Sequence, residues 1–321
     1  MARRLLLLVA VLACVAAACG GGDDDAPPDR TIAFLRAVGN ADEPQAAFLE
    51  PLAEAGWIQG ENLTIVAGDP MEAHTGDAAA EAVAGWLDEG VDLIVALSSS
   101  GAKVADEAAP DVPVLFLSTD PVATGLVADE RAPEGHLTGG TFQVPADRTL
   151  DVAIRALGGP VRFGLLWPAE DPAAMPVVDE FERAAGTLDV EVVDRSFADP
   201  AEVQAAVDAL VAEGAEALVL ANAPSLVMAF DAIRDAAVAA RLPVFANTSN
   251  DFAVATLRPD TTELYRQLGR QAVRLLSGTP VAKVPVEDPA SYVVVVDRSA
   301  ASKVGLTLPD DLLELADEVV G

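Results

Sequence analysis

The chain has 321 residues, 51% of them hydrophobic, and a formal net charge of −31 at pH 7. This length and apolar content allow a large buried core, suit two domains better than one and exclude a disordered protein. The acidity excludes nucleic acid as a partner, because its phosphates need neutralisation by Lys and Arg; a solvated surface explains the charge better than an acidic binding site.

The N-terminus has the pattern of a secretory signal. Arg3 and Arg4 are followed by an unbroken run of small and apolar residues from Leu5 to Ala18. This run is too short to span a bilayer comfortably, and a basic start with small residues before a cut is typical of a cleaved signal. We expect residues 1–18 to be a signal peptide that the mature protein lacks.

A cysteine follows the signal directly. Ala16-Ala17-Ala18-Cys19 leads into a Gly, Asp and Pro segment that contains no core-forming residue, so the site resembles a bacterial lipobox followed by a tether over residues 19–29. Acyl chains on Cys19 would hold the protein at a membrane, at about 0.8 kcal/mol per buried CH2. Cys14 is the alternative, but a cut there leaves a very short apolar region. The chain has no cysteine beyond Cys19, which excludes disulfides and cysteine metal sites in the mature domain.

From Arg30 onward, apolar runs alternate with alanine-rich stretches of helical period, which predicts βαβ units and a parallel sheet. In chain order we expect a strand at 31–35, a helix at about 42–55, a strand at 63–67, and a helix capped by Thr75 and ended by Gly90. Strands at 92–97, 112–117 and 137–142 follow, with a short helix at 101–109 between the first two. These elements complete one doubly wound layer.

The pattern then starts again, as a second lobe requires. A helix at 148–157 ends at Gly158, a strand covers 161–167, a helix 172–187 and a strand 190–194. Asp199, Pro200 and Glu202 combine an N-cap, a first-turn proline and a capping-box acid at the start of a helix that ends at Gly214. Strands at 217–220, 243–246 and 253–257 follow, and the helix between the first two turns Leu226, Val227, Phe230 and Ile233 inward.

Reactive constellations are missing from the sequence. His74 and His136 are not spaced as a metal pair or as a base beside a nucleophile, and we interpret both as loop residues. Glycine-rich nucleotide motifs and a Gly-x-Ser-x-Gly elbow are absent as well. The run Ser98-Ser99-Ser100 fits a helix-capping turn better than a nucleophile. We therefore expect no catalytic residue, no metal and no cofactor.

The loops after the strands carry short polar side chains and a few aromatics. In open α/β sheets ligands bind at the carboxyl ends of the strands, so these loops predict a site for a small polar molecule. Amides at the helix start after Ser98 suit a carboxylate, Asp120 an ammonium, and Trp167 an apolar or ring-bearing part. The candidate ligand-binding residues are Arg36, Ser98, Ser99, Ser100, Asp120, Thr141, Phe142, Trp167, Asn222, Asn247 and Thr248.

An ordered set of short motifs gives the sequence a family resemblance. They are Gly60-Glu61-Asn62-Leu63, Val91-Asp92-Leu93-Ile94-Val95-Ala96, Pro113-Val114, Asp120-Pro121-Val122, Gly125-Leu126-Val127, Leu137-Thr138-Gly139, Leu264-Tyr265-Arg266, Pro285-Val286-Glu287, Gly305-Leu306-Thr307-Leu308-Pro309 and Ala316-Asp317-Glu318-Val319-Val320. With them the chain resembles the ABC-transporter substrate-binding family that includes tryptophan- and tyrosine-binding lipoproteins.

The resemblance implies a type I periplasmic-binding-protein fold, a Venus flytrap of two α/β lobes joined by three crossovers. The N-terminal lobe would comprise 30–142 plus 259–282, with a helix at about 261–277. The C-terminal lobe would comprise 143–258 plus 283–321, with a strand at 293–296 and the last helix.

The function implied is that of an extracytoplasmic lipoprotein. As a monomer, the protein would capture an amino acid or amino-acid-like solute and deliver it to the permease and ATPase subunits of an ABC importer. Two alternatives stay open: a ligand-sensing module for a signalling partner, and a small-molecule enzyme on the same fold.

Overall fold

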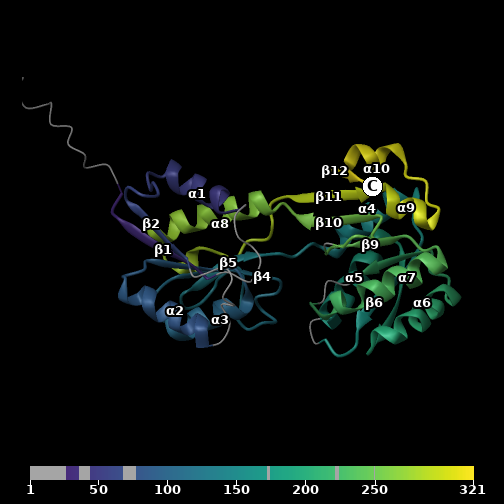
Figure 1. The fold of residues 1–321 in the computed structure, drawn as a ribbon, viewed down its shortest axis with the longest axis horizontal. Coiled ribbons are helices and arrows are strands. Elements are labelled where there is room, and N and C mark those ends of the chain that lie inside the picture. Colours follow the sequence, from purple (N-terminus) through teal and green to yellow (C-terminus); the bar gives the residue numbers. More distant parts are fainter. Residues whose placement is uncertain (1–26, 36–43, 68–76, 172–173, 221–223, 249) are drawn as a thin grey trace, which may run out of the picture.

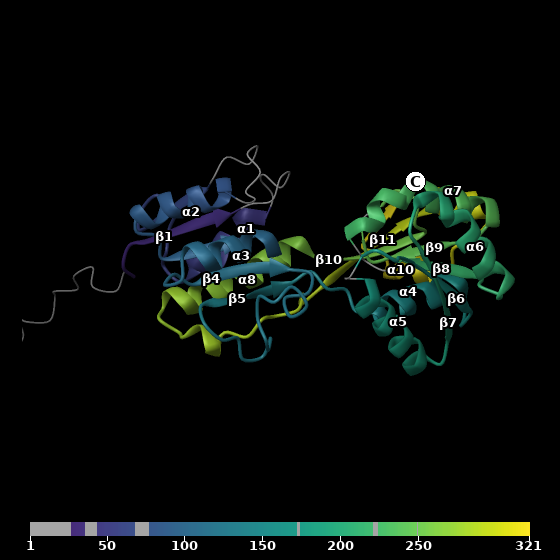
Figure 2. The same ribbon diagram turned by 90° about the horizontal axis from the view of Figure 1, so that it is seen from below.

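The computed structural model describes residues 27–35, 44–67, 77–171, 174–220, 224–248 and 250–321. Over these ranges the chain forms two lobes, each built on one sheet covered by helices on both faces (Figures 1 and 2). This is the α/β class expected from the alternating pattern. None of the helices in the described ranges has the length and apolarity needed to cross a bilayer.

The sheet of the first lobe has five parallel strands in the order β2-β1-β3-β4-β5. Helices cover both faces, so β3, β4 and β5 are buried along their whole length, as continuous apolar runs predict. The strand expected at 63–67 is reproduced, and the others shift by two residues or less. The strands are β1 (Arg30–Leu35), β2 (Leu63–Ala67), β3 (Leu93–Ala96), β4 (Val114–Ser118) and β5 (Leu137–Thr141).

Two pairs of helices cover this sheet. One face packs on α1 (Pro44–Glu54) and α8 (Thr261–Leu276), with Phe48, Leu52, Leu264 and Leu268 in the shared core. The other face packs on α2 (Asp77–Asp88) and α3 (Ser99–Ala108). Although α8 follows the second lobe in sequence, it lies beside α1 on the first lobe (Figure 1).

The second lobe has a seven-stranded sheet in the order β12-β11-β10-β9-β8-β6-β7. Its strands are parallel except at β10 and β11, which form an antiparallel pair. The strands are β6 (Arg162–Pro168), β7 (Glu191–Phe197), β8 (Ala217–Leu220), β9 (Val244–Ala246), β10 (Ala255–Pro259), β11 (Tyr292–Asp297) and β12 (Glu318–Val320).

The helices of the second lobe divide between its two faces. On one face lie α4 (Ala146–Leu157), α5 (Ala174–Leu188), α9 (Arg298–Val304) and α10 (Asp310–Leu315). On the other lie α6 (Val203–Ala212) and α7 (Phe230–Ala240). Three short 3-10 turns complete the described elements: η1 (Pro200–Glu202), η2 (Pro224–Ala229) and η3 (Val281–Lys283).

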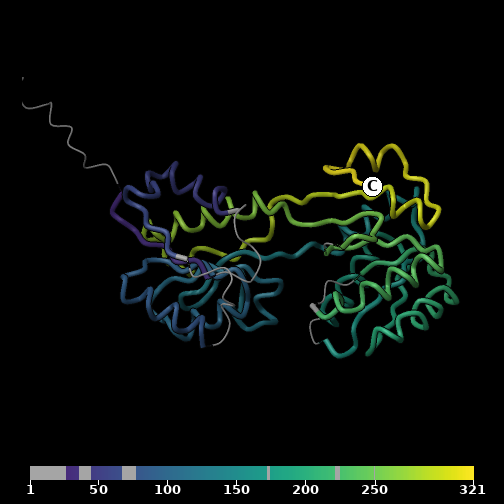
Figure 3. The backbone as a smooth tube through the Cα atoms, in the orientation of Figure 1, coloured from purple at the N-terminus to yellow at the C-terminus, as the bar shows by residue number. Residues whose placement is uncertain are grey.

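Three segments cross between the lobes, as the resemblance implies (Figure 3). The first crossing, residues 142–145, runs from β5 to α4; the second, residues 259–261, from β10 to α8; the third, residues 284–291, from η3 to β11. The first crossing leaves β5 at its carboxyl end, so the carboxyl ends of β5 and of the strands parallel to it point toward the second lobe. The second crossing leaves β10 at its carboxyl end, so the carboxyl ends of β10 and of the strands parallel to it point toward the first lobe. We call these the facing edges.

Some local expectations need correction and others hold. Val227 is 56% exposed in η2, whereas Leu226 and Ile233 are fully buried, because a 3-10 turn places side chains with a period different from that of an α-helix. Gly158 ends α4 in the left-handed conformation, as predicted. Asp199 accepts from the Ala201 N–H at 2.8 Å, but the turn it caps is η1, which precedes α6.

Candidate functional site

The serine run lies at the facing edge of the first lobe, between β3 and α3. Ser98 caps α3, and its Oγ accepts from the Gly101 N–H at 3.0 Å. Ser98 Oγ also lies 3.3 Å from Ser100 Oγ, and Ser99 Oγ lies 2.8 Å from Ser118 Oγ at the end of β4. The hydroxyls thus join two neighbouring strand ends at a helix N-terminus, a place that favours anions.

Acidic groups gather at the end of β4. Asp120 Oδ1 accepts from the Ala123 N–H at 2.8 Å, which fixes the turn that follows the strand. Burial, followed by the charges of Asp288, Asp120 and Asp129, raises the pKa of Glu130. This part of the edge is therefore negative and suits a positive ligand group rather than a second anion.

Thr141 and Phe142 lie where the first crossing leaves β5. Thr141 is buried, and its Oγ1 donates to Asp288 Oδ1 at 2.7 Å, so it ties the first crossing to the third. Phe142 is partly buried against the core shared with α8. The contacts of Thr141 and Phe142 are thus made within the first lobe, and a structural role accounts for both residues.

On the facing edge of the second lobe, Trp167 lies near the end of β6, and Asn247 directly follows β9. The Trp167 indole N–H donates to Asp194 Oδ2 at 2.8 Å, and the ring packs partly against the α4 and α5 core. Asn247 is 7% exposed, and its Nδ2 lies 3.5 Å from the Val144 carbonyl oxygen in the first crossing. Among the described residues its Oδ1 has no hydrogen-bond donor. Thr248 is partly buried, and its carbonyl accepts from Asn250 Nδ2 at 3.0 Å.

Several predicted positions lie outside the described residues, namely Arg36, Asn222, Cys19, His74 and the expected helix cap Thr75. The other histidine, His136, lies in the loop before β5 with Nε2 3.3 Å from Asp106 Oδ1. No group of three His, Cys, Asp or Glu side chains in the described part of the chain could hold a metal ion.

Two sets of polar contacts were not predicted from the sequence. Asp171 Oδ2 accepts from both the N–H and the Oγ of Ser225, at 3.1 and 2.7 Å, which joins the loops after β6 and β8. The buried Gln267 and Gln271 interrupt the apolar face of α8. That interruption was visible in the sequence as polar residues one turn apart within a helical apolar pattern.

Tyr292, at the start of β11, was also missed. Burial, followed by the charge of Asp288, raises the pKa of its phenol to about 12; Asp147 and Glu180 act in the same direction, and Arg148 opposes them. Asp288 belongs to the third crossing, and the other three side chains come from α4 and α5. The phenol therefore lies where the third crossing enters the second lobe.

Comparison with known proteins finds relatives among substrate-binding proteins. A "Tyrosine-binding protein" of Clostridioides difficile is 24% identical over 250 residues, which is 76% of this chain and 71% of the relative. The ligand-free, open structure of a substrate-binding protein with adhesive properties from Clostridium difficile superposes with a TM-score of 0.80 at 22% identity, covering 91% of this chain and 99% of the other.

A second structure, an ABC domain in complex with L-Trp from Streptococcus pneumoniae, superposes with a TM-score of 0.68 at 21% identity. It covers 91% of this chain and 100% of the other. At these identities the structures establish the fold, which is that of the two-lobed Venus flytrap solute-binding proteins. Residues 39–320 match the family described as ABC transporter substrate binding protein. That match spans most of the sequence, and the chain belongs to this family of extracytoplasmic solute-capturing proteins of ABC importers.

Proposed function

We propose that the protein captures an amino acid, or a compound with the same charged groups, between the facing edges of its two lobes. The observation that carries this proposal is the geometry of the crossings, which turns the carboxyl ends of both sheets toward each other. Ligands of open α/β sheets bind at such ends. The tyrosine-binding relative and the L-Trp complex support an amino acid as the ligand class.

Each charged group of an amino acid has a partner in this arrangement. The start of α3 offers backbone amides and the hydroxyls of the serine run to a carboxylate. Asp120, in the negative region at the end of β4, suits an ammonium group. From the second lobe, Trp167 offers its ring face, since its N–H is already bonded to Asp194, and Asn247 offers an amide oxygen that has no donor among the described residues.

Capture then consists of closure of the two lobes over the solute, without bond making. A ligand that contacts both lobes stabilises the closed form, because it binds that form better than the open one. Turnover of a bound amino acid would contradict this view.

The location that fits this role is the outer surface of the cell membrane. We propose that Cys19 carries the lipid anchor and that residues 19–29 act as the tether, with residues 1–18 removed as the export signal. The closed, monomeric protein then docks on the permease of an ABC importer. The measurement that bears on the anchor is the partition of the chain between membrane and soluble fractions.

The ligand is tested by thermal unfolding of the full chain in the presence of L-tyrosine, L-tryptophan, L-leucine, dipeptides and nucleosides. A ligand at about 100 times its Kd stabilises the folded state by about 2.7 kcal/mol. At about 2–4 °C per kcal/mol this raises Tm by roughly 5–10 °C. An increase with amino acids alone supports the proposal, and no increase with any amino acid contradicts it.

The role of Asp120 is tested by calorimetry with the amino acid that gives the largest shift. D120N keeps the acceptor for the Ala123 N–H but removes the charge, so we expect a loss of about 1.5–3 kcal/mol, or roughly 10- to 150-fold in Kd. D111N is the matched control, because exposed Asp111 precedes the same strand at its opposite end. Equal affinity of D120N and D111N would remove Asp120 from the site.

A further inference from the structure

The third crossing is tied to the first lobe almost to its end. Thr138 Oγ1 donates to the Val284 carbonyl at 2.5 Å, and the Val286 N–H donates to the Glu130 carbonyl at 2.7 Å. The Glu287 N–H donates to the Gly139 carbonyl at 3.0 Å, and its own carbonyl accepts from the Thr141 N–H at 3.0 Å. Residues 284–287 therefore lie along β5 like an added strand.

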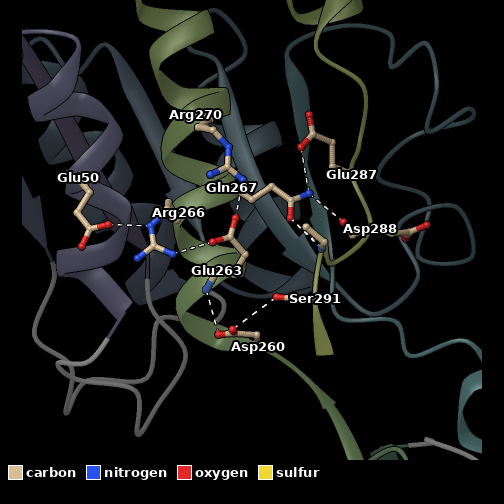
Figure 4. A network of polar contacts seen from close by, with 10 residues as sticks. Glu50, Asp260, Glu263, Arg266, Gln267, Arg270, Glu287, Asp288 and Ser291 are labelled. Atoms are coloured by element: carbon tan, nitrogen blue, oxygen red, sulfur yellow. Dashed lines mark hydrogen bonds and ion pairs between the residues drawn. The ribbon is translucent and has the colours of Figure 1, made fainter. Parts of the chain in front are cut away.

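Two buried glutamines of α8, Gln267 and Gln271, bond to the same segment; Figure 4 shows the first of them. Gln271 Nε2 donates to the carbonyls of Gly139 and Pro285 at 2.9 and 3.0 Å. One turn earlier, Gln267 Nε2 donates to the Asp288 carbonyl at 2.8 Å, and its Oε1 accepts from the Ala290 N–H at 3.2 Å. The bond to Ala290 is the last that we find between the third crossing and the body of α8; beyond it, Ser291 Oγ donates at 3.5 Å to Oδ2 of Asp260, where the second crossing meets that helix.

The next residue already belongs to the second lobe. The Asp260 N–H donates to the Ser291 carbonyl at 3.0 Å, and Pro259 pairs with Tyr292, so the second and third crossings form one antiparallel ribbon. Tyr292 packs against the core of the second lobe. Asp260 is also the N-cap of α8, where its Oδ1 accepts from the Glu263 N–H at 3.1 Å (Figure 4).

The first crossing changes lobes just as abruptly. The Phe142 N–H donates to the Ser118 carbonyl of β4 at 3.0 Å. Two residues later, Asn247 of the second lobe approaches the Val144 carbonyl at 3.5 Å, and the Ala146 N–H donates to Glu180 Oε1 at 2.9 Å. The Gln143 N–H still donates to Thr141 Oγ1 at 3.4 Å, so the change of lobe falls between Gln143 and Val144.

We propose that lobe motion is confined to three pivots: residues 143–144, residue 260 and the bond between residues 290 and 291. Gln267 is the positioning residue that fixes the third. This inference rests on the proposed capture by two lobes, and it places residues 284–290 with the first lobe. A short pivot restricts the lobes to a narrow set of orientations, because few backbone dihedrals are free to change.

Spin labels on the two lobes test the proposal without any ligand. The full chain carrying C14S and C19S has no other cysteine, so K103C on α3 and E182C on α5 place one label on an exposed position of each lobe. Pulsed electron paramagnetic resonance then gives the distribution of inter-label distances.

Q267M keeps an unbranched side chain of similar length but removes the bonds to the Asp288 carbonyl and the Ala290 N–H, while the Asp288 side chain stays bonded to Thr141. Residues 289 and 290 are then free instead of one residue, so the distribution widens by up to about 1.4-fold, following the square root of the free length. Q271M is the matched control: it removes two bonds from the same buried face upstream of the pivot, so we expect the parental width.

A second pair of variants avoids loss of buried bonds. A290G loosens the backbone at the pivot, and Ala290 is exposed, so the fold is little disturbed. A282G makes the same change at exposed Ala282 in η3 and should leave the width unchanged. Equal widths for Q267M and Q271M, or a parental width for A290G, would overturn the pivot assignment. Amino acid binding is measured in separate experiments, so a wrong ligand class and a wrong pivot assignment can be told apart.

Discussion

Gly269, near the middle of α8, allows the backbone of α1 to approach α8 closely. A Cβ at this position would lie 2.3 Å from the Phe48 carbonyl oxygen and 3.2 Å from Pro51 Cδ of α1. The carbonyl belongs to the backbone, so it cannot move aside as a flexible side chain would. Gly269→Ala must therefore separate the two helices that cover one face of the first sheet.

This packing decides whether Gly269→Ala raises or lowers the free energy of unfolding. In a helix interior free of contacts, Gly→Ala stabilises by about 0.5–1 kcal/mol. Forcing a methyl group into a packed interface costs about 1–3 kcal/mol. The clash outweighs the gain in helix propensity, so G269A should lower the free energy of unfolding by roughly 1–2 kcal/mol. Gly85 in α2 has nothing within 4 Å of such a Cβ, and G85A should stabilise the same lobe.

The assay is urea unfolding of the full chain, followed by far-ultraviolet circular dichroism, for the parent, G269A and G85A. The midpoint should fall for G269A and rise for G85A with unchanged slopes. A stabilised G269A would refute the reasoning, because it would mean that α8 does not pack on α1. The experiment thus also tests the placement of α8 on the first lobe.

Two further predictions concern titration and export. The pKa of Tyr292 is raised to about 12 from an ordinary value of 10.0, so the folded state resists ionisation of this phenol and stability should decline as pH rises from about 10 to 12. Y292F should remove a tyrosine transition near pH 12 in ultraviolet absorbance. A transition that Y292F leaves in place would contradict this. C19S should move the chain from the membrane to the soluble fraction while C14S leaves it membrane-bound; the reverse pattern would place the anchor on Cys14.

Local chemistry made most of the secondary structure predictable. Gly158, at the predicted helix end, has a positive φ of 74°, and Asp199 is an N-cap, as expected. Such signals act within one turn of the chain, so they can be found without knowledge of the rest. The strand β12 was missed because its three exposed residues pair with β11, and that neighbour is set by the tertiary fold.

The candidate site was less predictable, because polar loop residues find partners from distant strands. The Trp167 indole N–H is bonded to Asp194 of β7, and Thr141 to Asp288, a pairing across 147 residues. A sequence shows that such side chains lie at strand ends, but it does not show which of them are already satisfied. In this edge Asn247 Oδ1 stands apart, since it is buried without a donor among the described residues.

The buried polar side chains suggest how the fold holds its crossings. Burying a polar group is unfavourable unless it is hydrogen-bonded, so apolar residues are expected at such positions. In the described part of the chain, Thr138, Thr141, Asn247, Gln267 and Gln271 are buried polar residues that each bond to a crossing segment. Crossings carry backbone groups that no sheet or helix satisfies, and these side chains supply the missing partners. Polar residues that interrupt an apolar strand or helix face are therefore the sequence signal for where a two-lobed chain is anchored, and the free residues between anchors are where it bends.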